Sequence, residues 1–282
     1  MSARKALFAG SWYPDRPAEC EKEIKGFLRE KNTASLPGNY VGGIVPHAGW
    51  FFSGSIACNV INALNGEEPV DVIAVFGMHL SSSSLPYITT EGAWETPFGD
   101  IQIERDLASE LGKRFSFNVE TTSRFTQDNT IELQLPFIKY FFPDVKIVPI
   151  GVAPNDNAIE IGRAVVDMAD TLGLKLKVIG STDLTHYGTN YGFMPKGTGP
   201  DAVDWVKKKN DRQAIDAILD MNAPLLINEA AANQNACCAG AAAAAVSSAR
   251  ELGIEKGLEI AYSTSYDKSP GDSFVGYVGV LF

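Results

Sequence analysis

Short apolar runs alternate along the chain with longer segments of helical pattern, and this alternation restricts the possible folds more than any other feature. The apolar runs lie at 41–47, 71–77, 145–152, 176–182, 259–265 and 273–282. Helical patterns lie at about 17–31, 54–65, 104–114, 130–141, 156–172, 200–220 and 237–252. Strands that alternate with helices are typical of an α/β sheet with helices on both faces.

The apolar runs differ in a way that predicts their places in the sheet. Those near residues 41, 72, 146 and 177 are almost continuously apolar, as expected for central strands that are buried on both faces. The two C-terminal runs alternate more and carry Ser, Thr and Tyr, so we expect antiparallel strands at one side. We therefore predict a single domain, residues 1–282, built on a mixed, mostly parallel sheet.

Charge and composition exclude several classes of partner. Asp and Glu total 34 against 24 Lys and Arg, and no basic stripe is present, so a nucleic-acid backbone would be repelled. No apolar run approaches the roughly 18 residues of a membrane span, and the first residues lack the hydrophobic region of a signal peptide. The four cysteines form no CxxC pair, which fits reduced thiols. We expect a cytoplasmic protein that binds neither nucleic acid nor membranes.

All three histidines of the chain follow predicted strands in the same sense. His47 ends its strand in VPHAGW, His79 follows its strand in FGMHL, and His186 follows its strand in STDLTHY. Ligands of open α/β sheets bind beyond the carboxyl ends of the strands. One such histidine is more often a hydrogen-bonded structural residue. Three of them together predict a shared site at one edge of the sheet.

The spacing of His47 and His79 predicts a metal site. One βαβ unit separates them, so we expect neighbouring strands and a common ion, since imidazole suits Zn, Cu and Fe. Cys237 or Cys238 opens a predicted helix, whose N-terminal N–H groups and dipole favour a thiolate ligand. A buried cysteine that acts as a small hydrophobic residue is an equally good interpretation of either position.

Two further polar groups accompany these predicted strand ends. Asp183 lies three residues before His186, where it can orient the imidazole or act beside it in proton transfer. Asp183 can also cap the next turn through its own backbone. At the predicted helix near 130, Asp128, Asn129 and Glu132 can reach the edge of the sheet, although for Asn129 a role only as a helix cap is favoured.

Aromatic side chains lie in the loops GSWYP and WETPFGD. Trp12, Tyr13 and Trp94 can wall a pocket there or fill the surface, and the sequence favours neither role. The position of each relative to the histidines decides between them.

The motifs occur in the order seen in the Memo family, whose bacterial and archaeal members are called AmmeMemoRadiSam system protein B. They are AGSWYP at 9–14, PHAGW at 46–50, ETPFGD at 95–100, TIELQLPF at 130–137, STDLTHYG at 181–188, the cysteine segment at 237–240 and DSFVGYVG at 272–279. The sequence resembles this family over essentially its whole length. The resemblance implies a fold similar to the class III extradiol dioxygenases, with a metal site at one end of the sheet.

The resemblance also implies a set of site residues. The metal-binding set of the family falls on His47, His79 and Cys237, and Asp183 and His186 line the same pocket. Cys237 is selected because the Cys-Gly pair of the family aligns with the two adjacent cysteines. We expect the metal to be iron or copper, with zinc as an alternative.

Two positions depart from the family, and one ligand departs from the dioxygenases. An acidic residue followed by histidine usually precedes the I-E-x-x-L-P segment, but this chain has Asp128-Asn129. Cys238 stands where the family has glycine. The third ligand of the dioxygenases is a carboxylate, and a thiolate in its place favours Cu(I), Zn or a differently tuned Fe. Ring cleavage therefore does not follow from the resemblance.

Two main functions remain. One is a metal-dependent redox protein or oxidoreductase, with His186 as acid or base and Asp183 as its orienting carboxylate. The redox protein would activate a small-molecule ligand or oxygen at its metal. The other function is an adaptor whose pocket holds a peptide or a partner protein without turnover. The family's association with radical SAM and AMMECR-type proteins in microbes supports the adaptor. Zinc-dependent hydrolysis is a third interpretation.

Overall fold

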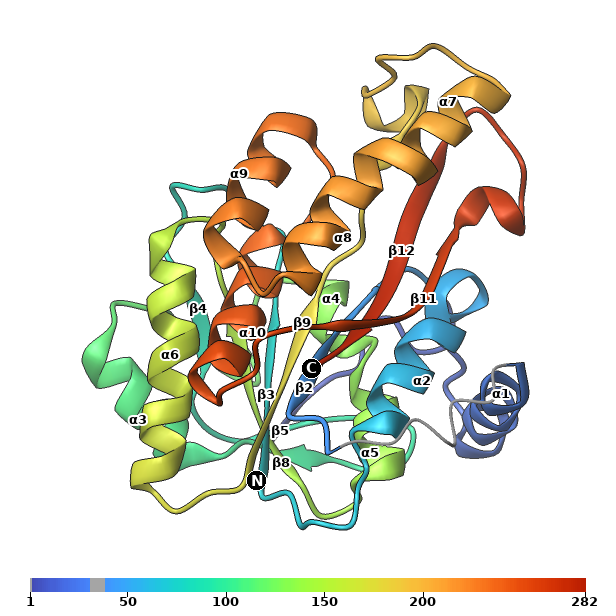
Figure 1. The fold of residues 1–282 in the computed structure, drawn as a ribbon. Coiled ribbons are helices and arrows are strands. Elements are labelled where there is room, and N and C mark those ends of the chain that lie inside the picture. Colours follow the sequence, from blue (N-terminus) through green and yellow to red (C-terminus); the bar gives the residue numbers. More distant parts are fainter. Residues whose placement is uncertain (1, 31–38) are drawn as a thin grey trace.

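The computed structural model describes residues 2–30 and 39–282, which form a large mixed sheet with helices on both faces (Figure 1). The strand order is β10-β12-β2-β9-β3-β8-β4-β7, with β11 paired to β12. The central parallel strands are β2 (Gly42–Val45), β9 (Leu176–Ser181), β3 (Val72–Gly77) and β8 (Lys146–Gly151). Nearly all of their residues are buried, as their continuous apolar runs predict.

Antiparallel pairs extend the sheet at both sides. At one side, β12 (Phe274–Leu281) pairs with β2, with β11 (Leu258–Thr264) and with β10 (His186–Tyr187). At the other side, β4 (Tyr87–Thr89) is antiparallel to β8, and β7 (Asn118–Glu120) is parallel to β4. The prediction of a mixed, mostly parallel sheet with C-terminal antiparallel strands at one side is confirmed. A separate small sheet joins β1 (Ala3–Arg4), β5 (Ala93–Trp94) and β6 (Ile101–Gln102).

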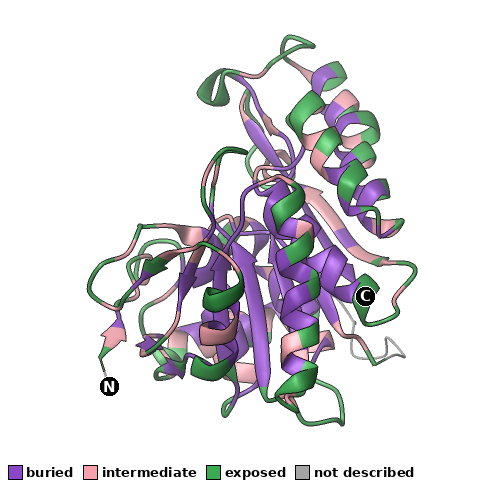
Figure 2. Ribbon diagram, turned by 90° about the vertical axis from the view of Figure 1, so that its left-hand side faces the viewer, coloured by how far each residue is buried: buried purple, intermediate pink, exposed green. Residues whose placement is uncertain are grey.

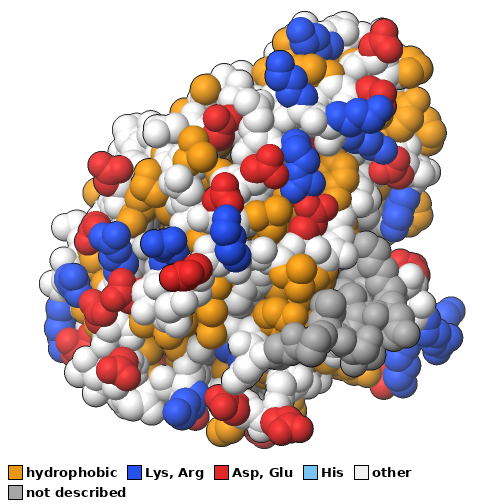
Figure 3. Space-filling view, viewed as in Figure 1, with side chains coloured by type: hydrophobic (Ala, Val, Ile, Leu, Met, Phe, Trp, Pro, Cys, Tyr) orange, Lys and Arg blue, Asp and Glu red, His pale blue; other side chains and the backbone are white. Residues whose placement is uncertain are grey.

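Two groups of helices cover the sheet. One face carries α2 (Ser55–Ala63), α1 (Pro17–Glu30) and α5 (Leu135–Phe141). The opposite face carries α10 (Ala239–Glu251), with α6 (Asp156–Thr171) and α9 (Ala223–Asn233) packed on it. Beside them, α3 (Arg105–Arg114) contacts β4, β8 and α6. The helices are buried toward the strands and exposed outside (Figure 2). On the outer surface in Figure 3, acidic and basic side chains are interspersed.

The α10 helix is buried along nearly its whole length because small residues allow it to pack closely on α6. A Cβ added to Gly162 would lie 2.3 Å from the carbonyl oxygen of Ala244, so the two helix backbones are almost in contact. Ser248 Oγ donates a hydrogen bond of 2.8 Å to the Gly162 carbonyl across the same contact. The small side chains of the alanine run 241–245 therefore allow α10 to pack closely between α6 and the sheet.

Three expectations need correction. The β2 and β3 strands are not neighbours, because β9 lies between them. The α10 helix begins at Ala239, so Cys238 is its capping residue and Cys237 precedes it. The sequence also missed α9, and it joined α4 (Asn129–Glu132) to α5. The one helix expected at 200–220 is confirmed as α7 (Pro200–Trp205) continued by α8 (Asp211–Leu219). A π-helical turn links α7 to α8. Among the described residues, no helix is long and apolar enough to cross a membrane.

Candidate metal centre

The candidate site lies where three parallel strands end. His47 lies two residues beyond β2, His79 two residues beyond β3 and Asp183 two residues beyond β9. Cys237 lies two residues before the first residue of α10, which packs on these strands. The carboxyl ends of parallel strands meet at one edge of the sheet, so these side chains converge although they come from distant parts of the sequence.

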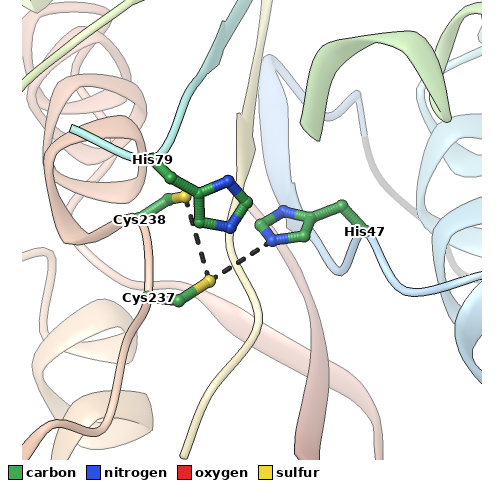
Figure 4. A group of neighbouring side chains, drawn as sticks. All are labelled: His47, His79, Cys237 and Cys238. Carbon is green, nitrogen blue, oxygen red and sulfur yellow. Dashed lines mark hydrogen bonds between the residues drawn. The ribbon is translucent and has the colours of Figure 1, made fainter. Parts of the chain in front are cut away.

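The two imidazoles and the two thiols form one compact cluster (Figure 4). The possible ligand atoms of His47, His79, Cys237 and Cys238 all lie within 4.8 Å of one another. His47 Nε2 lies 3.3 Å from Cys237 Sγ, and the ring centroids of the two histidines are 5.0 Å apart. The structure therefore brings together the three residues expected to bind a metal and adds the second thiol to them.

The His47 ring is held so that one nitrogen is free for a ligand. Its Nδ1 lies 3.0 Å from Ser181 Oγ, and the Ser181 hydroxyl donates in turn to the Thr130 carbonyl at 2.8 Å. The serine oxygen therefore accepts from Nδ1–H, which leaves Nε2 deprotonated when the imidazole is neutral. The backbone of His47 is fixed as well, because its N–H donates to Asp183 Oδ1 at 2.8 Å and its carbonyl accepts from Asn129 Nδ2 at 2.8 Å.

The His79 ring is held by Asp128. Asp128 Oδ2 lies 3.0 Å from His79 Nδ1, and Oδ1 of the same carboxylate accepts from the Thr130 N–H at 2.9 Å. Met78, just before His79, has φ 72°, a left-handed conformation that is uncommon outside glycine and that turns the chain at the end of β3. Burial disfavours the Asp128 carboxylate and the His79 imidazolium, but the hydrogen bond between them favours both charged forms. It lowers the pKa of Asp128 to about 2 and helps raise the pKa of His79 to about 10.

Backbone hydrogen bonds fix the two cysteines against the loop after β9. Cys237 N–H donates to the Asp183 carbonyl at 3.1 Å, and Asp183 N–H donates to Cys237 Sγ at 3.3 Å. Cys238 N–H donates to Thr182 Oγ1 at 3.1 Å. Burial disfavours the Cys237 thiolate, but the hydrogen bond with Cys238 and the charge of His47 lower the pKa of Cys237 well below its ordinary value. Burial and the neighbouring Cys237 raise the pKa of Cys238.

Asp183 lies between two histidines. Its Oδ2 is 3.8 Å from Nε2 of both His47 and His186, which is longer than a hydrogen bond, so the carboxylate acts on both rings through its charge. His186 Nε2 is buried and has no hydrogen-bond partner among the described residues, while its ring packs on Tyr191 with centroids 4.9 Å apart. Burial favours the neutral imidazole, but Asp183 and Cys237 raise the pKa of His186 to about 10.

A cavity of about 580 Å³ opens in front of these side chains. His47, His79, Asp183 and His186 contribute to its lining. Its aromatic walls are Trp12, Phe51, Phe52, Tyr191 and Tyr277. The lining residues that the structure describes include no lysine or arginine. A ligand in this cavity would meet aromatic and hydroxyl groups on its sides and imidazole nitrogens at its base.

Only one of the three loop aromatics predicted as wall candidates lines this cavity. Trp12 does so, whereas Tyr13 is buried and donates to Glu132 Oε1 at 3.1 Å. Trp94 is buried beneath the Arg4 guanidinium, whose carbon lies 3.7 Å from the ring centroid. The expectation that Asn129 serves only as a cap is wrong, because Asp128 caps the helix while Asn129 holds the His47 carbonyl.

The donor set fits a soft or borderline metal. Two imidazoles and a thiolate suit zinc, copper or iron and are poor ligands for hard cations such as Mg²⁺. Each imidazole has Nδ1 engaged by a hydroxyl or a carboxylate, as is usual for metal-binding histidines. The unpartnered Nε2 of His186 shows in addition that the hydrogen bonding of this region is incomplete without a further ligand.

Comparison with known proteins agrees with this architecture. The crystal structure of an uncharacterized protein from Escherichia coli K12 superposes with a TM-score of 0.54, covering 86% of this chain and 98% of that one. Sequence identity is 12%, so this likeness concerns the fold alone. Both chains share an α/β fold with a large mixed sheet.

Sequence comparison defines the family. The model of the Memo-like protein family matches residues 4–281, and the chain belongs to this family. A MEMO1 family protein of Pyrococcus furiosus is 30% identical over 99% of this chain and 98% of its own length. A MEMO1 family protein of Pyrobaculum aerophilum is 30% identical over 100% of this chain and 99% of its own length.

Proposed function

We propose that this chain is a metal-dependent redox protein that binds iron or copper through His47, His79 and Cys237. The observation that carries the proposal is the 3.3 Å approach of His47 Nε2 to Cys237 Sγ, with His47 Nδ1 already engaged by Ser181. Zinc fits the same donors, so the identity of the metal is part of the test. Bound iron or copper would supply electron transfer and Lewis-acid chemistry at the base of the cavity.

The residues around the metal would transfer protons, stabilise charge and orient the ligand. His186 would hold or release a proton at Nε2, the buried nitrogen for which the described part of the chain offers no hydrogen-bond partner. Asp183 would stabilise the protonated ring through its charge, at 3.8 Å. The aromatic walls would orient an uncharged or aromatic part of a small ligand and exclude water from it.

The first test is metal content and metal preference. Protein purified without oxygen should contain close to one equivalent of iron or copper by elemental analysis. In competition, the metal-free protein should prefer Cu(I), Fe(II) or Zn(II) over Mg(II), and tight binding of Mg(II) would contradict the donor set. A reversible change in the spectrum during redox titration should accompany iron or copper but not zinc, which has no redox chemistry in proteins.

The mouth of the cavity favours a second candidate function, that of an adaptor. The Phe51 side chain is 66% exposed, and Trp12 and Tyr191 are exposed beside it. Exposed aromatic groups around a cavity are suited to hold a peptide or a partner protein. We propose radical SAM and AMMECR-type proteins as the partners to test. Phe51→Ser should weaken such binding and leave metal content unchanged, whereas an unchanged affinity would count against the adaptor.

A further inference from the structure

Cys238 is a thiol that the proposed metal site does not use. Its Sγ lies 3.8 Å from Cys237 Sγ, close to van der Waals contact. The other free cysteines belong to other parts of the molecule, since Cys20 is buried and donates to the Pro14 carbonyl at 2.9 Å and Cys58 is buried in α2. Cys237 and Cys238 therefore form a separate pair of thiols next to the cavity.

The two sulfur atoms can be joined by a small movement. A disulfide requires a sulfur–sulfur distance of about 2.05 Å, so the two side chains must turn toward each other from their present separation of 3.8 Å. The N–H groups of both residues are held by Asp183 and Thr182, so the backbone is positioned in advance. Adjacent Cα atoms are about 3.8 Å apart, shorter than the usual 4.4–6.8 Å of disulfides, which makes this bond strained and easily reduced.

The exposure of the two thiols gives them different roles. Cys237 is half-buried, whereas Cys238 is buried. A small oxidant reaches Cys237 first, and Cys238 is the nearest thiol to resolve the product. An oxidised cysteine without such a neighbour proceeds to irreversible sulfinic and sulfonic acids. A second thiol in contact with the first therefore protects it and makes the oxidation reversible.

We infer that Cys237 and Cys238 form a reversible redox pair in which a hydroperoxide oxidises Cys237 and the two residues then close to a disulfide. In the first step the Cys237 sulfur attacks the peroxide, an S–O bond forms, the O–O bond breaks, and the leaving oxygen departs as water or an alcohol. In the second step the Cys238 sulfur displaces the hydroxyl group, which leaves with the Cys238 proton as water. The peroxide is reduced and the two thiols are oxidised.

The consequence for metal binding rests on the proposed function. The sulfur of a disulfide is not a thiolate, so the closed pair lacks the third donor next to His47 and His79. Oxidation would release a metal bound through Cys237, and a dithiol reductant would restore the site. Formation of the disulfide itself requires no metal, so the two ideas can be tested separately.

The experiment uses the full chain, freed of metal and treated with hydrogen peroxide. After quenching, the protein is denatured, alkylated with N-ethylmaleimide and measured by intact mass. The number of alkylated thiols should fall from four to two and return to four after treatment with dithiothreitol. Trypsin releases residues 213–250 as one peptide, which should have lost two hydrogens. If the peptide keeps both thiols, the inference is wrong.

Variants separate the pair from general oxidation. Cys238→Ser and Cys238→Ala should carry sulfinic or sulfonic acid at Cys237, which dithiothreitol does not reduce. Cys58→Ser has three thiols, and it should fall to one and return to three after dithiothreitol. Identical products from the wild type and both Cys238 variants would overturn the inference.

Zn(II) added before the peroxide should slow disulfide formation several-fold. Equal rates with and without bound zinc would reject Cys237 as a ligand and leave the redox pair intact. If the chain binds zinc but forms no disulfide when it is free of metal, the redox pair is rejected and the metal site is kept.

Discussion

Asp128 Oδ2 lies 3.0 Å from His79 Nδ1 and 3.2 Å from the His79 N–H, so one carboxylate oxygen fixes both the ring and the backbone of this residue. The other oxygen caps α4 through the Thr130 N–H. The Nε2 atom of His79 is thereby left as the nitrogen that can bind a metal. The Asp128-Asn129 pair of this chain thus serves both histidines, because Asn129 holds the His47 carbonyl.

Replacing Asp128 by Asn should weaken metal binding without unfolding the protein. The amide oxygen can still cap α4, but the charge that orients His79 is lost, and changes of this kind typically cost about 10–100-fold in metal affinity. The measurement is the dissociation constant for Zn(II), from competition with a chromophoric chelator. Asp144→Asn, at an exposed position, is the control. Equal affinities for the two variants would show that Asp128 does not support the site.

Alanine substitutions should separate the proposed ligands from the proposed proton-transfer group. His47→Ala and His79→Ala should lose stoichiometric metal, because each removes one of the donors that converge within 4.8 Å. His186→Ala should keep its metal and change only ligand binding or chemistry. Elemental analysis of the three variants, with folding checked by circular dichroism, makes the comparison. Equal loss in all three would make His186 a ligand.

A buried carboxyl group should give the stability a pH dependence. Asp211 accepts from the Thr185 N–H at 3.0 Å and from the Tyr262 hydroxyl at 2.7 Å, and burial raises its pKa from 3.8 to about 6. The folded state then binds the proton more tightly than the unfolded state. Stability from this group is present below pH 3.8 and is lost as the pH rises through 6.

Asp211→Asn should remove this loss. The variant minus wild-type difference in the free energy of unfolding should increase by roughly 3 kcal/mol between pH 3.8 and 6. This figure follows from about 1.4 kcal/mol for each unit by which the pKa is raised. Urea denaturation at several pH values measures the difference. Asp216→Asn, whose exposed carboxylate pairs with Arg212, should show no such trend. A difference that is constant with pH would mean that Asp211 is ionised throughout.

The close contact of α6 and α10 should be intolerant of a single methyl group. In Gly162→Ala the new Cβ would lie 2.3 Å from the Ala244 carbonyl oxygen, so we expect the free energy of unfolding to fall by about 1–3 kcal/mol. Gly26→Ala in α1 is the matched control, because no atom of residues 2–30 or 39–282 lies within 4 Å of its added Cβ. That change should raise stability by roughly 0.5–1 kcal/mol. Thermal or urea denaturation compares them, and a neutral Gly162→Ala would show that the helices can separate.

Much of the site could be predicted from the sequence because the end of a strand can be recognised from the residues around it. Apolar runs followed by His47 and His79 are visible in the chain, and parallel strands bring their ends together whatever their order. The order itself is a long-range property, so the spacing of the histidines wrongly predicted neighbouring strands. The insertion of β9 next to β2 places the segment after β9, which carries both Asp183 and His186, beside His47.

The residues that the sequence did not reveal are those whose roles depend on contacts between loops. Ser181 reads as the last residue of an apolar strand, and only the structure shows its hydroxyl at the His47 ring. Phe51 and Tyr191 carry no motif that distinguishes them from other aromatic residues, yet they wall the cavity. The α9 helix was missed because its alanine-rich sequence has no clear polar and apolar faces.

His47 and Cys237 are separated by 190 positions in the sequence, and their contact closes one of the largest loops in the chain. Closing a loop of this length costs conformational entropy, so the contact depends on the packed strands and helices that hold its two ends. An unfolded or half-folded chain therefore offers no preformed site, and a metal would bind almost exclusively to the native state. By mass action the metal would stabilise the native state, so the fraction of folded protein would depend on the concentration of available metal.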